Sequence, residues 1–191
     1  MSVVLCEDTA INSTKHNRIG LGQQESDQPL LLKLIQVMAA YTNLKARKRA
    51  DYRYHLDYRT RWSDNDVYAH MNNSNYYFLF DSVVNTYLIK HCGLQPSTST
   101  TIGLVVHSHC DYFAPVGFPD VVDMALRVNK LGKSSVTYEI GVFQQGKEEV
   151  CAVGEFIHVF VDSASRRPHA EGMGEAMKTG LSKLFVETPK L

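Results

Sequence analysis

Residues 61–91 have the sequence RWSDNDVYAHMNNSNYYFLFDSVVNTYLIKH, in which a loop rich in Asp and Asn runs directly into a long amphipathic segment. The loop covers residues 63–73, and helical spacing of apolar side chains predicts a helix over residues 74–91. Gly93 is well placed to end this helix. Its apolar face is broad and aromatic, which indicates a helix covered over much of its surface. The face comprises Tyr76, Tyr77, Leu79, Phe80, Val83, Val84, Tyr87 and Leu88.

Strand patterns flank the helix on both sides. One precedes it at residues 52–62, and four follow without an intervening helix, at residues 102–113, 122–129, 135–142 and 150–161. Alternation of apolar and polar residues with short turns at Gly132 and Gly146 is typical of an antiparallel meander. Such a sheet has one apolar face, and one long helix is available to cover it. We therefore predict an α+β protein whose antiparallel sheet wraps around a long central helix.

The remaining segments lie outside this pattern. Residues 1–28 are polar without periodicity and are predicted to form a flexible N-terminal tail. Pro29 is expected to open an N-terminal helix over residues 29–50 that packs on its own domain or on a partner subunit; a membrane surface is the alternative. The main domain is expected at residues 51–188, with its core at 52–162. Residues 172–185 look helical.

The composition argues against several classes of protein. Lys and Arg total 20, as do Asp and Glu, so no global positive field favours nucleic acid. The four cysteines are scattered and predict reduced thiols, not a disulfide framework. No apolar run reaches the ~18 residues of a membrane span, and no secretory signal is evident. We expect a cytoplasmic protein; the alternative is the peroxisome, because Pro189, Lys190 and Leu191 resemble a variant of a peroxisomal address.

The loop before the helix carries the groups that thioester hydrolysis requires. Asp64, Asp66 and His70 are candidate acids, bases or nucleophiles, and three amides follow at Asn72, Asn73 and Asn75. Hydrolysis needs a base or nucleophile and donors for the developing oxyanion. Free N–H groups at a helix N-terminus can supply those donors. The structural alternative is that these residues only cap the helix.

The segment Asp66-Val-Tyr-Ala-His-Met-Asn-Asn-Ser-Asn-Tyr76 resembles the active-site motif of the hydroxybenzoyl-CoA thioesterase-like hot-dog enzymes. It is most similar to the long-chain acyl-CoA thioesterase branch, with Asp-Val-Tyr-x-His-Val-Asn-Asn, and also resembles the plant acyl-carrier-protein thioesterases. The resemblance covers roughly residues 52–162. It implies a hot-dog fold, hydrolysis of an acyl-CoA to free acid and CoA, no cofactor beyond the CoA of the substrate, and a homodimer or homotetramer.

The resemblance also implies roles for individual residues. Asp66 matches the catalytic Asp, acting as general base or nucleophile. The backbone N–H that forms the oxyanion hole falls near Asn73, and His70 matches a His that orients the loop or the substrate. The plant enzymes have Asn where this chain has Tyr68, so an Asn-assisted mechanism is not expected and Tyr68 can line the acyl pocket instead. Asp64 is expected to be structural.

Substrate contacts are predicted at two further places. Tyr76, Tyr77 and Phe80 lie near the start of the helix and are expected to wall the acyl pocket, unless they are ordinary core. Arg166 and Arg167 follow the last strand, where similar enzymes border the CoA entrance. They can pair with phosphates or lie in a solvated turn.

His107 and His109 lie two apart on one strand and share a face, which is compatible with a metal. No third ligand is evident in the sequence, so no metal is expected.

Two other functions remain open. A hot-dog enoyl-thioester hydratase or dehydratase resembles Asp-x-Asn-Pro-x-His, but here His70 is four residues after Asp66 and both Asn and Pro are missing. The other alternative is a non-catalytic acyl-binding or scaffold protein.

Overall fold

The computed structural model describes residues 24–187. Within this range, residues 24–38 and residues 39–187 belong to two separate units, and the contacts below lie within the second. The elements follow in the order α1 (Gln24–Lys45), β1 (Tyr54–Arg59), α2 (Asn73–His91), β2 (Thr101–Tyr112), β3 (Val121–Leu131), β4 (Ser135–Gln144), β5 (Val150–Asp162) and α3 (Glu175–Ser182), with 3-10 turns at Arg49–Asp51 and Trp62–Asp64.

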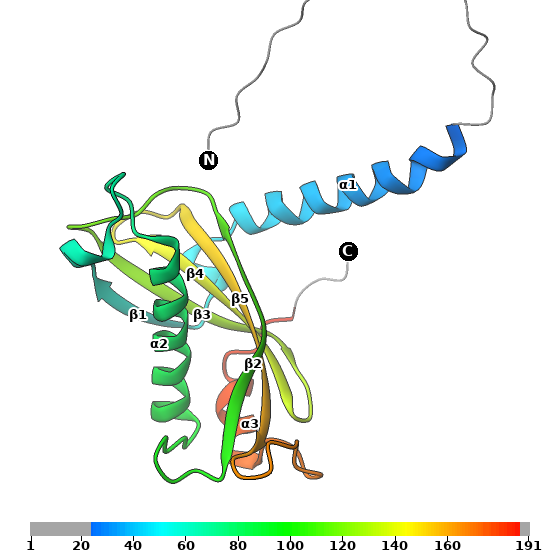
Figure 1. The fold of residues 1–191 in the computed structure, drawn as a ribbon, viewed down its shortest axis with the longest axis vertical. Helices are drawn as coiled ribbons and strands as arrows, with labels where there is room; N and C mark the ends of the chain where they lie inside the picture. Colours follow the sequence, from blue (N-terminus) through cyan, green and yellow to red (C-terminus); the bar gives the residue numbers. More distant parts are fainter. Residues whose placement is uncertain (1–23, 188–191) are drawn as a thin grey trace, which may run out of the picture. The chain divides into compact units, whose positions relative to one another are not determined.

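The five strands form one antiparallel sheet in the order β1-β3-β4-β5-β2. Strands β3, β4 and β5 are joined by two consecutive hairpins, whereas β1 and β2 are added at the two edges. The sheet curves around α2, as Figure 1 shows. The predicted hot-dog arrangement is therefore confirmed.

The main core lies between α2 and the sheet face that α2 covers. The ring of Phe80 is fully buried and lies against the backbone of Gly154 on β5, where a Cβ atom would collide with it. Close approach of a helix to a strand requires a residue without a side chain at such a point. The other large buried side chains in this cluster include Leu88, Met124, Leu126, Tyr138, Ile140, Phe160, Leu181 and Leu184.

The opposite face of the sheet holds a smaller cluster and a buried charge. Arg47, which follows α1, forms two parallel hydrogen bonds with Glu139 of β4, at 2.7 and 3.1 Å. Asn129 and Tyr52 also donate to this carboxylate, at 2.8 and 3.0 Å. Burial alone would raise the pKa of Glu139, but the hydrogen bonds from Arg47 and Asn129 outweigh it and lower the pKa. These contacts fasten the end of α1 to the sheet.

The N-terminal helix differs from the expectation. It begins at Gln24, before Pro29, and ends at Lys45, before most of the basic run. Gln and Glu are good helix formers, so polar residues without apolar periodicity still continue a helix. The apolar side chains Leu31, Leu34 and Ile35 are exposed, and the surface on which this helix packs stays a prediction. Most of the predicted tail and the tripeptide 189–191 lie outside the described residues, in which no helix is long and apolar enough to cross a membrane.

Candidate active site

The loop between β1 and α2 is closed on itself by backbone hydrogen bonds. Asp66 N–H donates to His70 O at 2.8 Å, and Asn72 N–H donates to Asp64 O at 2.8 Å, beside a β-bridge that joins Asn65 to Met71. Met71 N–H donates to Val116 O at 2.7 Å, which ties the loop to the segment after β2. The loop is therefore held at the start of α2 and near the end of β2.

Asp66 is half-buried in this loop. Its Oδ1 atom accepts hydrogen bonds from the backbone N–H groups of Tyr68, at 2.8 Å, and His70, at 3.3 Å. Its other carboxylate oxygen accepts no hydrogen bond from any group in residues 24–187. One oxygen thus fixes the orientation of the side chain, and the second is free to contact a water molecule or a substrate.

Asp64 lies in a different environment, with only 2% of its surface exposed. It accepts hydrogen bonds from Arg61 Nη2 at 2.9 Å, from the Arg61 backbone N–H at 2.7 Å and from the Tyr58 hydroxyl at 2.9 Å. Burial would raise the pKa of Asp64, but the hydrogen bonds from Arg61 and Tyr58 prevail and lower it. Both of its oxygens are occupied, so Asp64 closes the loop and has no oxygen free for a reactant.

The three Asn residues of the motif make different hydrogen bonds. Asn72 caps α2, because its Oδ1 atom accepts from Ser74 N–H at 3.0 Å and from the Ser74 hydroxyl at 2.8 Å. The side chain of Asn75 donates to Asp64 O at 2.8 Å. The backbone N–H of Asn73, the first residue of α2, has no acceptor among the described residues. It is therefore a free donor at the positive end of the helix dipole.

The outer side of the loop is apolar and uncovered. Val67 and Tyr68 are 92% and 78% exposed, and His70 is exposed as well. Trp62, earlier in the same connection between β1 and α2, is 79% exposed, and its ring lies edge-to-face against Phe118 at a centroid distance of 5.8 Å. Exposed apolar side chains that gather in one loop suit a surface that binds a ligand or a partner.

A groove of about 430 Å³ runs beside the loop, between the first half of α2 and β2. It is lined by Ser74, Tyr77, Phe78, Asp81, Val105 and Phe156. Tyr77 stacks on Phe156, with ring centroids 6.3 Å apart.

Of the three helix residues predicted to line the acyl pocket, only Tyr77 reaches this groove. Tyr76 and Phe80 lie one helical turn apart on the stripe that faces the sheet, and both are buried in the core. Phe78 and Phe156 line the groove but were not predicted. Phe78 lies on the polar face of the predicted helix, and an aromatic residue on that face was the one signal in the sequence. Phe156 lies on a distant strand, and no pattern linked it to the helix.

Arg166 and Arg167 are exposed in the turn that follows β5. Asp162 Oδ1 accepts from Ser165 N–H at 2.7 Å, and Arg166 N–H donates to Asp162 O at 2.9 Å. The sheet register places this turn beside Thr101, at the start of β2, whereas the loop with Asp66 lies near the end of β2. Within one chain, the turn that carries the two arginines therefore lies at the other end of β2 from the loop before α2, as the ribbon in Figure 1 shows.

Comparison with known proteins gives the family. A family model described as the thioesterase-like superfamily matches residues 60–178. The PA5185 protein from Pseudomonas aeruginosa is 48% identical and has a TM-score of 0.70, covering 72% of this chain and 95% of that one. A 1,4-dihydroxy-2-naphthoyl-CoA thioesterase from Synechocystis is 15% identical, with a TM-score of 0.61 over 69% of this chain and 96% of its own.

The SAV2348 protein from Staphylococcus aureus, whose structure was solved in complex with CoA, is 16% identical to this chain. It has a TM-score of 0.63, covering 72% of this chain and 87% of that one. At these identities the Synechocystis and Staphylococcus proteins share the fold.

Proposed function

The chain belongs to the thioesterase-like superfamily, and on that premise we propose that it hydrolyses an acyl-CoA to the free acid and CoA with Asp66 as the catalytic carboxylate. One observation carries the assignment. The loop holds a carboxylate with one oxygen, and leads into a helix with a first N–H group, that have no hydrogen-bond partner in residues 24–187. A structure solved with CoA for a protein of the same fold supports CoA as the carrier.

In the proposed reaction, Asp66 either removes a proton from the attacking water or attacks the thioester carbonyl itself. The N–H of Asn73 donates to the oxyanion that forms, and the helix dipole adds to this stabilisation. The C–S bond then breaks and CoA leaves as the thiolate, which takes up the proton released by the water. If Asp66 attacks the carbonyl itself, the resulting mixed anhydride is hydrolysed by a water molecule, which releases the acid and restores the carboxylate. These steps need a base or nucleophile and hydrogen-bond donors, which the chain provides, and no cofactor besides the CoA of the substrate.

We assign the acyl group to the groove beside α2. Its walls are mainly aromatic and apolar, with Tyr77, Phe78 and Phe156 the largest side chains. The groove begins at Ser74, the residue after Asn73, so a thioester bound at the helix start directs its acyl chain along it. Tyr68 remains a proposed pocket residue, and His70 a residue that orients the loop.

The site is completed, in this proposal, by a second subunit. Strand β2 pairs only with β5 among the described residues, and its middle residues Val105 and Val106 are exposed. Antiparallel pairing of two β2 strands places the start of one beside the end of the other. Such a dimer brings Arg166 and Arg167 of the partner subunit to Asp66, where they can bind the phosphates of CoA.

Mixing two defective variants tests this arrangement. Asp66→Asn removes the carboxylate, and the double variant Arg166→Ala/Arg167→Ala removes the phosphate contacts. If each site is shared between subunits, a mixed dimer contains one site with both wild-type halves, and the mixture regains thiol release from a panel of acyl-CoA esters. If each site is formed by one chain alone, the mixture releases thiol no faster than the two variants do separately.

Thiol release from acyl-CoA esters by the purified wild-type chain tests the proposed hydrolysis directly. Acyl-CoA binding without thiol release would identify a non-catalytic binding protein, and a change in enoyl absorbance without thiol release would identify a hydratase. Either outcome would overturn the proposed hydrolysis.

A further inference from the structure

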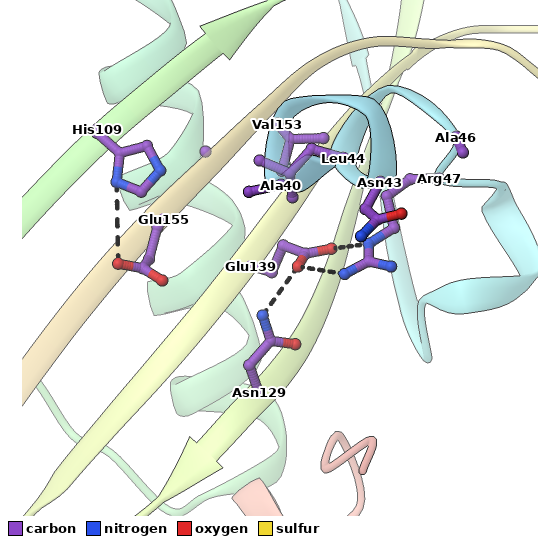
Figure 2. Close-up of a pocket in the computed structure, with 11 residues that line it drawn as sticks. Ala40, Asn43, Leu44, Ala46, Arg47, His109, Asn129, Glu139, Val153 and Glu155 are labelled. Atoms are coloured by element: carbon purple, nitrogen blue, oxygen red, sulfur yellow. Dashed lines mark hydrogen bonds and ion pairs between the residues drawn. The ribbon is translucent and has the colours of Figure 1, made fainter. Parts of the chain in front are cut away.

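A second cluster of reactive side chains lies on the sheet face opposite α2. It consists of His107 and His109 of β2 with Glu155 of β5. His109 Nδ1 lies 3.4 Å from His107 Nε2, and each of these atoms lies 3.8 Å from Glu155 Oε1. The sheet register pairs His109 directly with Glu155, and Figure 2 shows these two side chains pointing toward each other across adjacent strands.

We propose that His107 Nε2, His109 Nδ1 and Glu155 Oε1 bind one divalent transition-metal ion, with Zn²⁺ the preferred ion. Two imidazoles and a carboxylate, with a fourth position open, form a known type of zinc site. Ligand bonds of about 2.0–2.2 Å in a tetrahedral arrangement place neighbouring donor atoms roughly 3.3–3.5 Å apart. The separations of 3.4, 3.8 and 3.8 Å require only sub-ångström movements of side chains that are partly exposed.

The surroundings of the cluster fit this role. His109 presents its other ring nitrogen, Nε2, to Asp111 Oδ2 at 3.6 Å. A carboxylate in that position orients a metal-binding imidazole. Within the described chain, the polar partners of the Glu155 carboxylate are the two histidines alone. Binding an ion therefore disrupts no other ion pair.

The proposed site differs from the site with Asp66: its ligands lie on β2 and β5, on the sheet face opposite α2, whereas Asp66 lies in the loop that leads into α2. His109 and Glu155 line a cavity of about 600 Å³ that is bounded on its far side by Leu44 and Arg47 at the end of α1 (Figure 2). Water can reach the open coordination position through this cavity. Because its ligands come from two strands, a bound ion joins the edge strand β2 to β5.

The test uses the full chain without an affinity tag, after treatment with a chelator. Zn²⁺ is titrated in competition with a chromophoric chelator, and metal content is measured after dialysis. We expect one Zn²⁺ per chain, a rise in melting temperature that saturates at this ratio, and visible absorption typical of low-coordinate Co²⁺ when that ion replaces zinc. Mg²⁺, which prefers oxygen ligands, should not compete.

Three variants locate the ion. His107→Ala/His109→Ala should weaken binding at least ~100-fold and Glu155→Gln at least ~10-fold, in line with the loss of ligands and of ligand charge. The matched control is His55→Ala, which removes an exposed histidine from β1, the strand at the other edge. Unfolding without metal checks that the variants are folded. Equal zinc binding by wild type and the double histidine variant, no binding by wild type, or unchanged binding by Glu155→Gln would each overturn the site.

Discussion

At the scale of single residues, Asp64 and Asp66 show how two neighbouring carboxylates acquire different roles. Asp64 is enclosed by Arg61 and Tyr58, whereas Asp66 keeps one oxygen unoccupied. We expect Asp66→Asn to lower kcat at least ~100-fold, in line with loss of a general base or nucleophile, with little change in melting temperature. Steady-state kinetics and thermal unfolding of the same preparation check this.

Asp64→Ala is the contrasting variant. It leaves the hydroxyl of Tyr58 and the donors of Arg61 without their acceptor, which should cost about 1–3 kcal/mol of unfolding free energy. A stable, active Asp64→Ala protein, or wild-type turnover by Asp66→Asn, would contradict these two assignments.

Tyr77 and Phe80 are expected to respond differently to truncation. Phe80 is 0% exposed and packs against Gly154, so Phe80→Ala should lower the unfolding free energy by about 3–5 kcal/mol. Tyr77 is only partly buried at the wall of the groove, so Tyr77→Ala should shift kcat/KM toward longer or bulkier acyl chains at a smaller cost in stability. If Tyr77→Ala reduces kcat/KM evenly for every chain length, the acyl group does not occupy this groove.

At the scale of the elements, the end of α1 depends on Glu139. Removing one partner from a buried ion pair leaves an uncompensated charge and typically costs about 3–5 kcal/mol. Glu139→Ala should therefore destabilise the domain strongly, since Arg47 and Asn129 lose their acceptor. Glu148→Ala is the control, because Glu148 is exposed near the β4–β5 turn. Urea unfolding of both variants compares them, and equal midpoints would exclude this role for Glu139.

The sequence predicted which segments form strands and helices better than it predicted which of these elements lie side by side. Alternation in β3 and β4, and the aromatic face of α2, were sufficient for a sheet wrapped around a helix. The proximity of His109 and Glu155 depends on the pairing of β2 with β5, which no local pattern specifies. For the same reason, the sequence did not point to Glu155 as the third ligand of the proposed metal site. Tyr76, Tyr77 and Phe80 share one apolar face of the helix. Only the packed structure shows that Tyr77 lines the groove, whereas Tyr76 and Phe80 are buried in the core.

At the scale of the whole molecule, we expect at least a dimer at micromolar concentration. Val106→Glu places a negative charge on the edge of β2 that has no partner strand in the described residues, and two such charges lie close together if two of these edges pair. Light scattering after size exclusion should show the wild-type mass fall to that of one chain in the variant, and thiol release should fall with it. A wild-type chain that is already monomeric and active would exclude the shared site.

Acid should destabilise the molecule through His158. This ring is 3% exposed, and neither of its nitrogens has a hydrogen-bond partner in the described residues. Burial lowers its pKa to about 4, although the charge of Asp81 opposes the shift slightly. The unfolded chain binds this proton near pH 6.5 and the folded chain only near pH 4. The contribution of His158 is therefore complete above pH 6.5 and falls by about 3 kcal/mol as the pH decreases toward 4.

Urea unfolding of wild type and His158→Leu at pH 7, 5 and 4 measures this contribution. The variant should lose less stability than wild type between pH 7 and pH 4, because it has no imidazole to protonate at this position. Comparing the two proteins removes the effect of Asp64 and Glu139, whose lowered pKa values also reduce stability in acid. Parallel pH curves would show that His158 does not titrate during unfolding.

The strand order has a consequence during synthesis. The ribosome makes β1, α2 and β2 first, yet β1 pairs with β3 and β2 pairs with β5. Until β3 emerges, the nascent chain carries an aromatic helix and two strands that have no sheet to join. Such non-local pairing is slow and leaves apolar surface open to aggregation. Chains stalled before residue 121 should therefore be digested readily by protease and retained by chaperones, and protection should begin only after the β3–β4–β5 hairpins have left the exit tunnel.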